Sequence, residues 1–210
     1  YLYDLAGRMA TVMDAEGNVT EYEYDIDSNL SLERHRAQLP SAAAEQVFQT
    51  DYAYDALDRI VLQTERSSRA SADWLRTSYE YDSRGNRTAI VDPAGNRSEY
   101  DYDGLSRLIA SRQLVSTAVD GGAIQTSTEY DKASRVTALI DDQGNSTTYE
   151  YDGLHRLKLR TMPDGSTYSG EYDELNQPCR VTEERGVIFT SVFDELNRIT
   201  SRTADLSNTL

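Results

Sequence analysis

The residues of this 210-residue chain that could do chemistry are mostly carboxylates: 36 Asp and Glu, against two His and one Cys. A pair of carboxylates could supply the acid and the base of a glycosidase. Such catalysis needs one special constellation of groups, whereas these acids recur at regular intervals along the whole chain. We therefore predict no catalytic residue and no enzyme activity.

The run that begins at Asp25 imitates the start of a calcium-binding loop. The sixth position of such a loop should be Gly and is Leu30, and the twelfth should be Glu and is Arg36. The run is therefore interpreted as a turn, and we predict no metal at it.

The two histidines and the cysteine provide too few ligands for a structural zinc site. His155 occupies a position that other copies of a repeat fill with turn formers, so we expect a solvated turn residue. We place His35 in an insertion. Cys179 falls in a strand column, where we expect a filler and not a nucleophile. No cofactor is predicted.

The formal charge of −15 bears on the choice of partners. A surface this acidic repels phosphate backbones and anionic lipid heads, so we expect no nucleic-acid partner. No stretch approaches the ~18 apolar residues of a membrane span. A single cysteine excludes an intrachain disulfide. The chain opens at Tyr1 with no signal-peptide pattern, and we expect it to be a piece of a longer protein.

An aromatic residue followed by Asp stands at the same place in nine copies of a repeat, and five of the eight spacings between successive copies are 21 residues. The aspartates of these pairs are Asp4, Asp25, Asp55, Asp82, Asp103, Asp131, Asp152, Asp173 and Asp194. The aromatic residues before them are Tyr3, Tyr24, Tyr54, Tyr81, Tyr102, Tyr130, Tyr151, Tyr172 and Phe193. A second tyrosine stands two residues earlier at Tyr1, Tyr22, Tyr52, Tyr79, Tyr100 and Tyr149. Residues two apart on a strand share a face, which predicts aromatics on one face, acids on the other, and a tyrosine-over-tyrosine ladder between neighbouring copies.

Turn formers fix where each strand ends. The residue three after the Asp is a turn former such as Gly7. The next is usually arginine, at Arg8, Arg59, Arg107, Arg135, Arg156 and Arg198. A second turn, 13 residues after the Asp, holds Gly17, Gly95, Gly144, Gly165 and Gly186. Each copy is therefore predicted to be one β-hairpin, with the arginine pairing with an acid on an adjacent strand or covering a tyrosine.

The predicted fold class is all-β: about nine tandem hairpins over residues 1–210, forming an open, curved antiparallel sheet of ~16–18 strands. Longer hairpin loops are expected near 31–50, 61–78 and 108–129, and a short helical turn is conceivable at 41–47. No separate toxin or catalytic domain is expected within the chain.

The sequence resembles the YD-repeat (Rhs) family, best at Tyr3-Asp4-Leu5-Ala6-Gly7-Arg8-Met9 and over residues 149–157. The resemblance implies a spiralling sheet that closes into a hollow shell. In bacterial Rhs, wall-associated and insecticidal-complex proteins such a shell encloses a toxic C-terminal domain, and in teneurins it is displayed outside the cell. It thus implies a secreted or cell-surface scaffold whose partners are further repeats and a C-terminal toxin or effector.

The chain departs from the family pattern in two columns. The arginine is replaced at Asn29, Asn86 and Gln177, and the earlier tyrosine at Thr128, Gly170 and Ser191. We interpret these changes as repeat drift. A different class of function stays open: an adhesive module that binds glycans or a surface partner through its tyrosine stripes.

Overall fold

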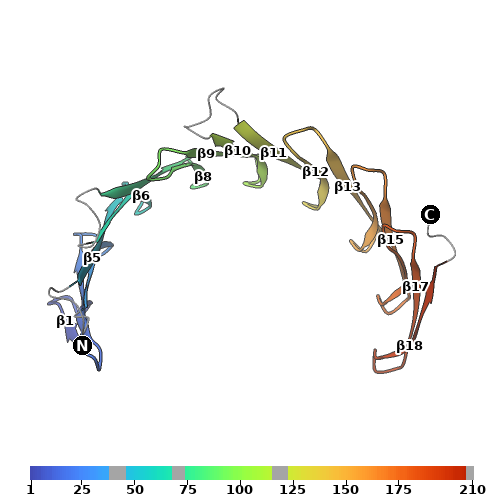
Figure 1. Cartoon of the computed structure of the whole chain (residues 1–210), viewed down its shortest axis with the longest axis horizontal. Coiled ribbons are helices and arrows are strands. Elements are labelled where there is room, and N and C mark those ends of the chain that lie inside the picture. Colours follow the sequence, from blue (N-terminus) through green and yellow to red (C-terminus); the bar gives the residue numbers. More distant parts are fainter. Residues whose placement is uncertain (38–45, 68–73, 115–122, 207–210) are drawn as a thin grey trace. The chain divides into compact units, whose positions relative to one another are not determined.

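The computed structural model describes residues 1–37, 46–67, 74–114 and 123–206 (Figure 1). These residues form 18 β-strands and no helix, which confirms the all-β prediction and the expected number of strands. The chain consists of two compact units, one of residues 1–101 with 112–123 and one of residues 102–111 with 124–210. None of the described residues belongs to a helix long and apolar enough to cross a membrane.

The first nine strands are β1 (Leu2–Tyr3), β2 (Met9–Met13), β3 (Val19–Tyr24), β4 (Leu30–Ala37), β5 (Gln46–Tyr54), β6 (Ile60–Ser67), β7 (Leu75–Tyr81), β8 (Arg87–Val91) and β9 (Arg97–Tyr102). The other nine are β10 (Leu108–Leu114), β11 (Ala123–Tyr130), β12 (Val136–Ile140), β13 (Ser146–Tyr151), β14 (Leu157–Thr161), β15 (Thr167–Tyr172), β16 (Pro178–Thr182), β17 (Ile188–Phe193) and β18 (Ile199–Asp205). From β1 to β9 in the first unit, and from β11 to β18 in the second, each strand pairs antiparallel with its neighbour in sequence.

The two kinds of turn share one geometry. In the turn after the aromatic–Asp pair, the Gly7 amide donates to the Asp4 carbonyl at 3.0 Å and the Asp4 amide to the Arg8 carbonyl at 2.8 Å. The second turn repeats both bonds from Asp14 to Gly17 and Asn18. A three-residue loop of this kind ends in a residue of left-handed backbone conformation and matches the twist of the strands. The alternation of strand and turn predicted from the Gly, Asp and Asn columns is therefore confirmed.

The third residue after each aromatic–Asp pair has a positive φ in all nine copies. Glycine fills only two of these positions, Gly7 and Gly85. The other seven hold larger side chains, among them His155 at 66° and Asp58 at 57°. The pairing of the two strands that such a turn connects shifts by one residue close to the turn, as it does between Glu150 and Tyr151. The extra residue forms a bulge, which increases the local twist of the hairpin.

The insertions do more than lengthen loops. The structure does not describe residues 38–45, 68–73 and 115–122. Most of the helical turn expected at 41–47 therefore lies outside the described residues. The strands on either side are long, however: β4 and β5 have 8 and 9 residues, where β2 and β3 have 5 and 6. His35 is therefore in a strand opposite Thr20, and Val47 is in a strand opposite Arg36. The insertion in which we placed His35 is therefore partly strand, because some of the inserted sequence adds rungs to the hairpin ladder.

The sheet has almost no core of its own. Among the described residues only Leu32, Ala89 and Ala138 are buried apolar side chains, and no large side chain is fully buried. All three lie directly opposite a glutamate across the hairpin, as Ala89 does opposite Glu80. A usual domain buries an apolar layer between two layers of structure. Each unit here is instead a single layer of hairpins (Figure 1), so polar contacts between neighbouring copies must contribute much of its stability.

The left-handed turn residues provide a first test. His155 is exposed and has a φ of 66°, a conformation that costs a residue with a Cβ about 1–2 kcal/mol and glycine almost nothing. We expect His155→Gly to raise the free energy of unfolding by about 1 kcal/mol in urea denaturation. The control Lys158→Gly, in strand β14, should lower it by about 0.5–1 kcal/mol. A loss of stability in His155→Gly would contradict the left-handed turn.

Candidate functional site: the inter-repeat junction

The aspartate of each aromatic–Asp pair organises its own turn. One oxygen of Asp103, Oδ1, accepts the amides of Leu105 at 2.8 Å and Arg107 at 3.0 Å. The other, Oδ2, accepts Nε of Arg107 at 2.6 Å. A short side chain that takes up turn amides in this way holds the hairpin in register. The expected local role of the aspartate is thus present in the structure.

These contacts favour the charged carboxylate. Hydrogen bonds from the side chain and then the amide of Arg107 hold the pKa of Asp103 below its ordinary value of 3.8. At the second turn, hydrogen bonds from the side chain of Asn18 lower the pKa of Asp14 in the same way. The same direction and the same leading cause apply to the pKa values of Asp82, Asp92 and Asp141, each beside an asparagine.

The arginine after the turn reaches from its own copy into the next. Arg107 is bound to Asp103 through Nε, while its Nη1 donates to the carbonyl of Asp131 at 3.1 Å and to Oγ of Ser134 at 3.0 Å. Its guanidinium carbon lies 4.6 Å from the centroid of the Tyr130 ring. A guanidinium so placed over an aromatic face contributes roughly 0.5–2 kcal/mol, more as water is excluded. One side chain therefore joins the turns of two neighbouring copies.

Four other copies repeat this junction. The guanidinium lies 4.5–4.7 Å from the next ring in the pairs Arg8–Tyr24, Arg59–Tyr81, Arg135–Tyr151 and Arg156–Tyr172. In each of them Nη1 also donates to the carbonyl of the next aspartate, at 3.0–3.5 Å. The arginine side chains of all five junctions are only 22–29% exposed. The prediction that the arginine covers a tyrosine is confirmed, whereas the acid it pairs with belongs to its own turn.

The tyrosine hydroxyl adds a hydrogen bond that runs from the later copy back to the preceding one. The hydroxyl of Tyr130 donates to the carbonyl of Leu108, in the preceding copy, at 2.9 Å. The same bond, at 2.8–3.0 Å, is made by Tyr24, Tyr54, Tyr81, Tyr151 and Tyr172. Burial, the main cause, raises the pKa of the Tyr54 and Tyr172 hydroxyls, which favours the protonated donor.

The expected tyrosine ladder takes another form. Tyrosines of neighbouring copies stand two strands apart, about 9.5 Å, which is too far for ring-to-ring contact. The arginine stands immediately before the strand between them, as Arg107 does before β10, so a guanidinium fills the gap, and tyrosine and arginine alternate. The ring pair found among the described residues is His35–Phe48, with centroids 6.5 Å apart, on the lengthened strands β4 and β5.

The copies in which asparagine replaces the arginine keep part of the junction contacts. Asn29 binds Asp25 and reaches Asp58 of the next copy at 2.7 Å. Asn86 binds Asp82 at 2.8 Å. Repeat drift therefore shortens the bridging side chain in these copies without removing the turn.

In the most altered junction, both the arginine of one copy and the tyrosine of the next are replaced. Gln177 replaces the arginine, and Phe193 replaces the tyrosine whose ring and hydroxyl the junction uses. Nε2 of Gln177 donates to Oδ1 of Asn197 at 2.6 Å, as Nη1 of Arg156 does to Oδ1 of Asn176 at 2.8 Å. Oε1 of Gln177 is buried and has no hydrogen-bond partner among the described residues.

The other residues considered from sequence stand apart from the junction. His155 is an exposed turn residue, as expected. Cys179 is in strand β16, and its Sγ lies 3.4 Å from the carbonyl of Glu171 in β15. The carboxylate of Asp25 accepts the amides of Asp27 and Asn29 and is engaged in its own turn. In the described part of the chain no three His, Cys, Asp or Glu side chains gather as metal ligands would.

Two roles of side chains in the turns were not predicted from sequence. Asp14, Asp92 and Asp141 open the second turn as the paired aspartates open the first. Their signal was an Asp three residues before the Gly. The side chain three after the paired Asp also serves as an acceptor, as Ser28 does for Arg8 at 2.8 Å.

The altered junction can be rebuilt as a test. In Phe193→Tyr the new hydroxyl should reach the carbonyl of Pro178 and raise the free energy of unfolding by about 0.5–1.5 kcal/mol. In Gln177→Arg the guanidinium should bind Asp173 and remove the orphaned oxygen. Combining the two should add about 0.5–1 kcal/mol beyond the sum in urea denaturation. Phe48→Tyr, outside this column, is the matched control, and strict additivity would argue against the junction.

Acid should weaken the turns. A carboxylate whose pKa is lower in the folded chain contributes stability above the unfolded value of 3.8, and this stability is lost as the pH falls through the folded value. We therefore expect the urea midpoint to fall below about pH 4. Asp103→Asn should flatten this dependence more than Glu195→Gln, which removes an exposed carboxylate from a turn tip. Equal pH profiles for the two variants would contradict the assignment.

Known proteins carry the same pattern. Residues 1–119 match the Teneurin YD-shell family and residues 130–167 match the RHS Repeat family. Teneurin-3 of Danio rerio is 34% identical, and Teneurin-3 of Mus musculus 33% identical, over 118 residues. Each match covers 53% of this chain and 4% of the relative, so the chain spans a small part of their length.

Solved structures share the fold. The crystal structure of TcdB2-TccC3-TEV and the structure of the Photorhabdus luminescens Tc holotoxin pore each match 99% of this chain and 11% of the other chain, with a TM-score of 0.68 and 16% identity. The Teneurin YD-shell match covers more than half of the residues, and the first five aromatic–Asp turns, from Asp4 to Asp103, lie within it. The chain belongs to the Teneurin YD-shell family of YD- and RHS-repeat proteins.

Proposed function

We propose that this chain is a segment of a shell wall that encapsulates or presents a C-terminal toxin or effector domain of a secreted or cell-surface protein. The observation that carries the proposal is the junction itself. It recurs in both units, links copy to copy, and leaves a single layer with almost no buried core. Such a layer is suited to form a surface around something else and offers little interior in which to build an active site.

The repetition supports a scaffold and not an enzyme. The aspartates and arginines are held by each other and by turn amides in every complete junction. A catalytic acid or base usually stands out by an environment unlike that of its neighbours. The remaining repeats of the full-length protein and its C-terminal domain are the partners that this role requires.

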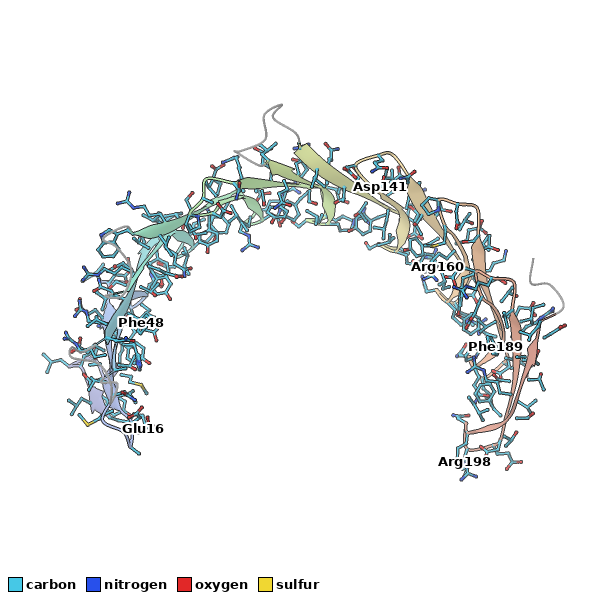
Figure 2. The ribbon with its side chains drawn as sticks, viewed as in Figure 1. Glu16, Phe48, Asp141, Arg160, Phe189 and Arg198 are labelled. Atoms are coloured by element: carbon cyan, nitrogen blue, oxygen red, sulfur yellow. The ribbon has the colours of Figure 1, made fainter. Side chains whose placement is uncertain are left out.

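Exposed leucines at the aspartate turns of both units fit contacts with such partners. The second residue of the aspartate turn is leucine in five copies, and each is 64–71% exposed: Leu57, Leu105, Leu154, Leu175 and Leu196. Exposed apolar side chains that repeat at one turn position can form a contact surface when the copies stack. The opposite turns hold mostly charged or small residues at their tips, such as Glu16 (Figure 2).

The alternative, adhesion to glycans through the tyrosine stripes, has less support. A sugar needs an open ring face on which to stack. One face of the tyrosine in each of the five arginine junctions, such as Tyr151, lies under a guanidinium, and its hydroxyl is already bonded to a carbonyl. The stripes are therefore better explained as the contacts that hold the copies together.

The test uses the full-length protein and a protease. Arg135→Ala removes the bonds to Asp131 and Asp152 and the contact with Tyr151. If the wall encloses the C-terminal domain, this variant should expose it, and its cleavage should become several-fold faster by gel electrophoresis. Lys158→Ala, an exposed change in strand β14, should leave the rate unchanged. Equal cleavage of the domain in the wild type and Arg135→Ala would argue against enclosure.

A further inference from the structure

The junction between the aspartate turns at Asp173 and Asp194 lacks the cation that the complete junctions hold. In eight of the nine copies, Oδ2 of the paired aspartate accepts a hydrogen bond of 2.6–3.2 Å from the side chain four residues later. Asp173 is the exception. Its Oδ1 accepts the amides of Leu175 and Gln177, and within the described chain no group donates to its Oδ2. One carboxylate oxygen is therefore left open at this turn.

The side chain of Gln177 does not take the place of the cation. Its Nε2 donates to Oδ1 of Asn197 at 2.6 Å and not to Asp173. Gln177 is only 8% exposed, and among the described residues its Oε1 has no hydrogen-bond partner. A glutamine also carries no charge. This junction thus holds a carboxylate oxygen and a buried amide oxygen that no donor satisfies, and the negative charge of Asp173 is not neutralised.

An open hollow lies at the same junction. Its volume is about 380 Å³, and its lining includes Asp173, Gln177 and Phe193. Ser191 also lines it, at the position where six other copies have the earlier tyrosine. Phe193 takes the place of Tyr172, whose ring lies 4.5 Å from a guanidinium carbon, whereas in the described part of the chain no cation lies over Phe193. The hollow therefore combines an unneutralised carboxylate with an uncovered aromatic ring.

The complete junction next to it shows which group would fit. Nε of Arg156 binds the aspartate of its own turn at 2.6 Å, and Nη1 donates to the carbonyl of Asp173 at 3.4 Å, while the guanidinium covers Tyr172. The corresponding acceptors in the hollow are the carboxylate of Asp173 and the carbonyl of Asp194, and the corresponding ring is that of Phe193. A planar guanidinium can donate to several acceptors and stack on a ring at once, which a compact ammonium cannot do.

We propose that this hollow binds the guanidinium of an arginine side chain presented by another protein segment. The guest guanidinium donates to Oδ2 of Asp173 and to the carbonyl of Asp194, and it lies over the ring of Phe193. Leu175, 67% exposed, lines the same hollow and packs against the methylene stem of the guest. A cationic guest also suits a chain with a formal charge of −15. The site depends on the geometry of one junction and holds whether or not the array encloses another domain.

The experiment titrates blocked arginine, N-acetyl-arginine amide, into the 210-residue chain and follows amide signals by NMR spectroscopy. We expect saturable shifts of the side-chain amide of Gln177 and of the amides around Asn197, with a dissociation constant in the millimolar range. Blocked citrulline, which has nearly the same shape without the charge, should cause no such shifts. Blocked lysine, which has the charge without the planar fork, should bind at least about threefold more weakly.

Four variants test the residues. Gln177→Arg should abolish binding, because the guanidinium of the chain itself then fills the hollow. Asp173→Asn should weaken binding about tenfold or more. Phe193→Leu, which keeps an apolar side chain without the ring, should weaken it about two- to fivefold. Glu174→Gln is the matched control, since it removes an exposed carboxylate from the same turn and should leave binding almost unchanged.

The same spectra show whether each variant is folded. Gln177→Arg is expected to be more stable than the wild type, so a loss of binding in this variant cannot be attributed to unfolding. Equal binding of blocked arginine and blocked citrulline would overturn the proposal. So would binding to Gln177→Arg as tight as to the wild type, or the absence of saturable shifts at this junction.

Discussion

The structure depends on one side chain that belongs to two repeats. The arginine after each aromatic–Asp turn is held by its own aspartate and reaches the carbonyl and the ring of the next copy, as Arg156 does with Asp152, Asp173 and Tyr172. A lone hairpin is marginal in water, and stacked copies stabilise each other through their interfaces. With three buried apolar residues in the described chain, these interfaces cannot rely on a hydrophobic core. They rely on charge-assisted hydrogen bonds shielded by a tyrosine ring.

The turn conformation serves this arrangement. A left-handed residue stands just before the arginine and the register shifts by one beside this turn, so that the arginine, immediately before the next strand, faces its aspartate. That conformation is unfavourable for a side chain with a Cβ, yet His155 and Asp58 adopt it. The hydrogen bonds of the aspartate and the arginine offset the cost. Where the arginine has become Asn29 or Asn86, the bond to the aspartate is retained although the reach is shorter.

The fold could be predicted from sequence because the same residues recur at the same positions in many copies, so that a change in one copy does not hide the pattern. Nine aromatic–Asp pairs and five glycines at a fixed distance define strands and turns more firmly than any single copy could. The contacts between copies were harder to predict. Spacing shows that tyrosines share a face, but not that the strand between them places an arginine in the gap. The long strands β4 and β5 were missed for another reason: Leu30–Ala37 carries no repeat residue past its start, so the ladder could not be distinguished from a loop.

The aspartate turns and the second turns differ in the insertions that they tolerate. Junction contacts gather at the aspartate turns, where a longer loop would separate an arginine such as Arg135 from Asp152 and Tyr151. The second turns are held by bonds within the turn itself, as Asn145 is by Asp141. All three insertions fall between strands that the second turn would otherwise join: β4 and β5, β6 and β7, and β10 and β11. An insertion there adds rungs to one hairpin and leaves the neighbouring junctions intact. Each unit can therefore vary in sequence at its second turns, while its aspartate turns keep the spacing that holds the copies together.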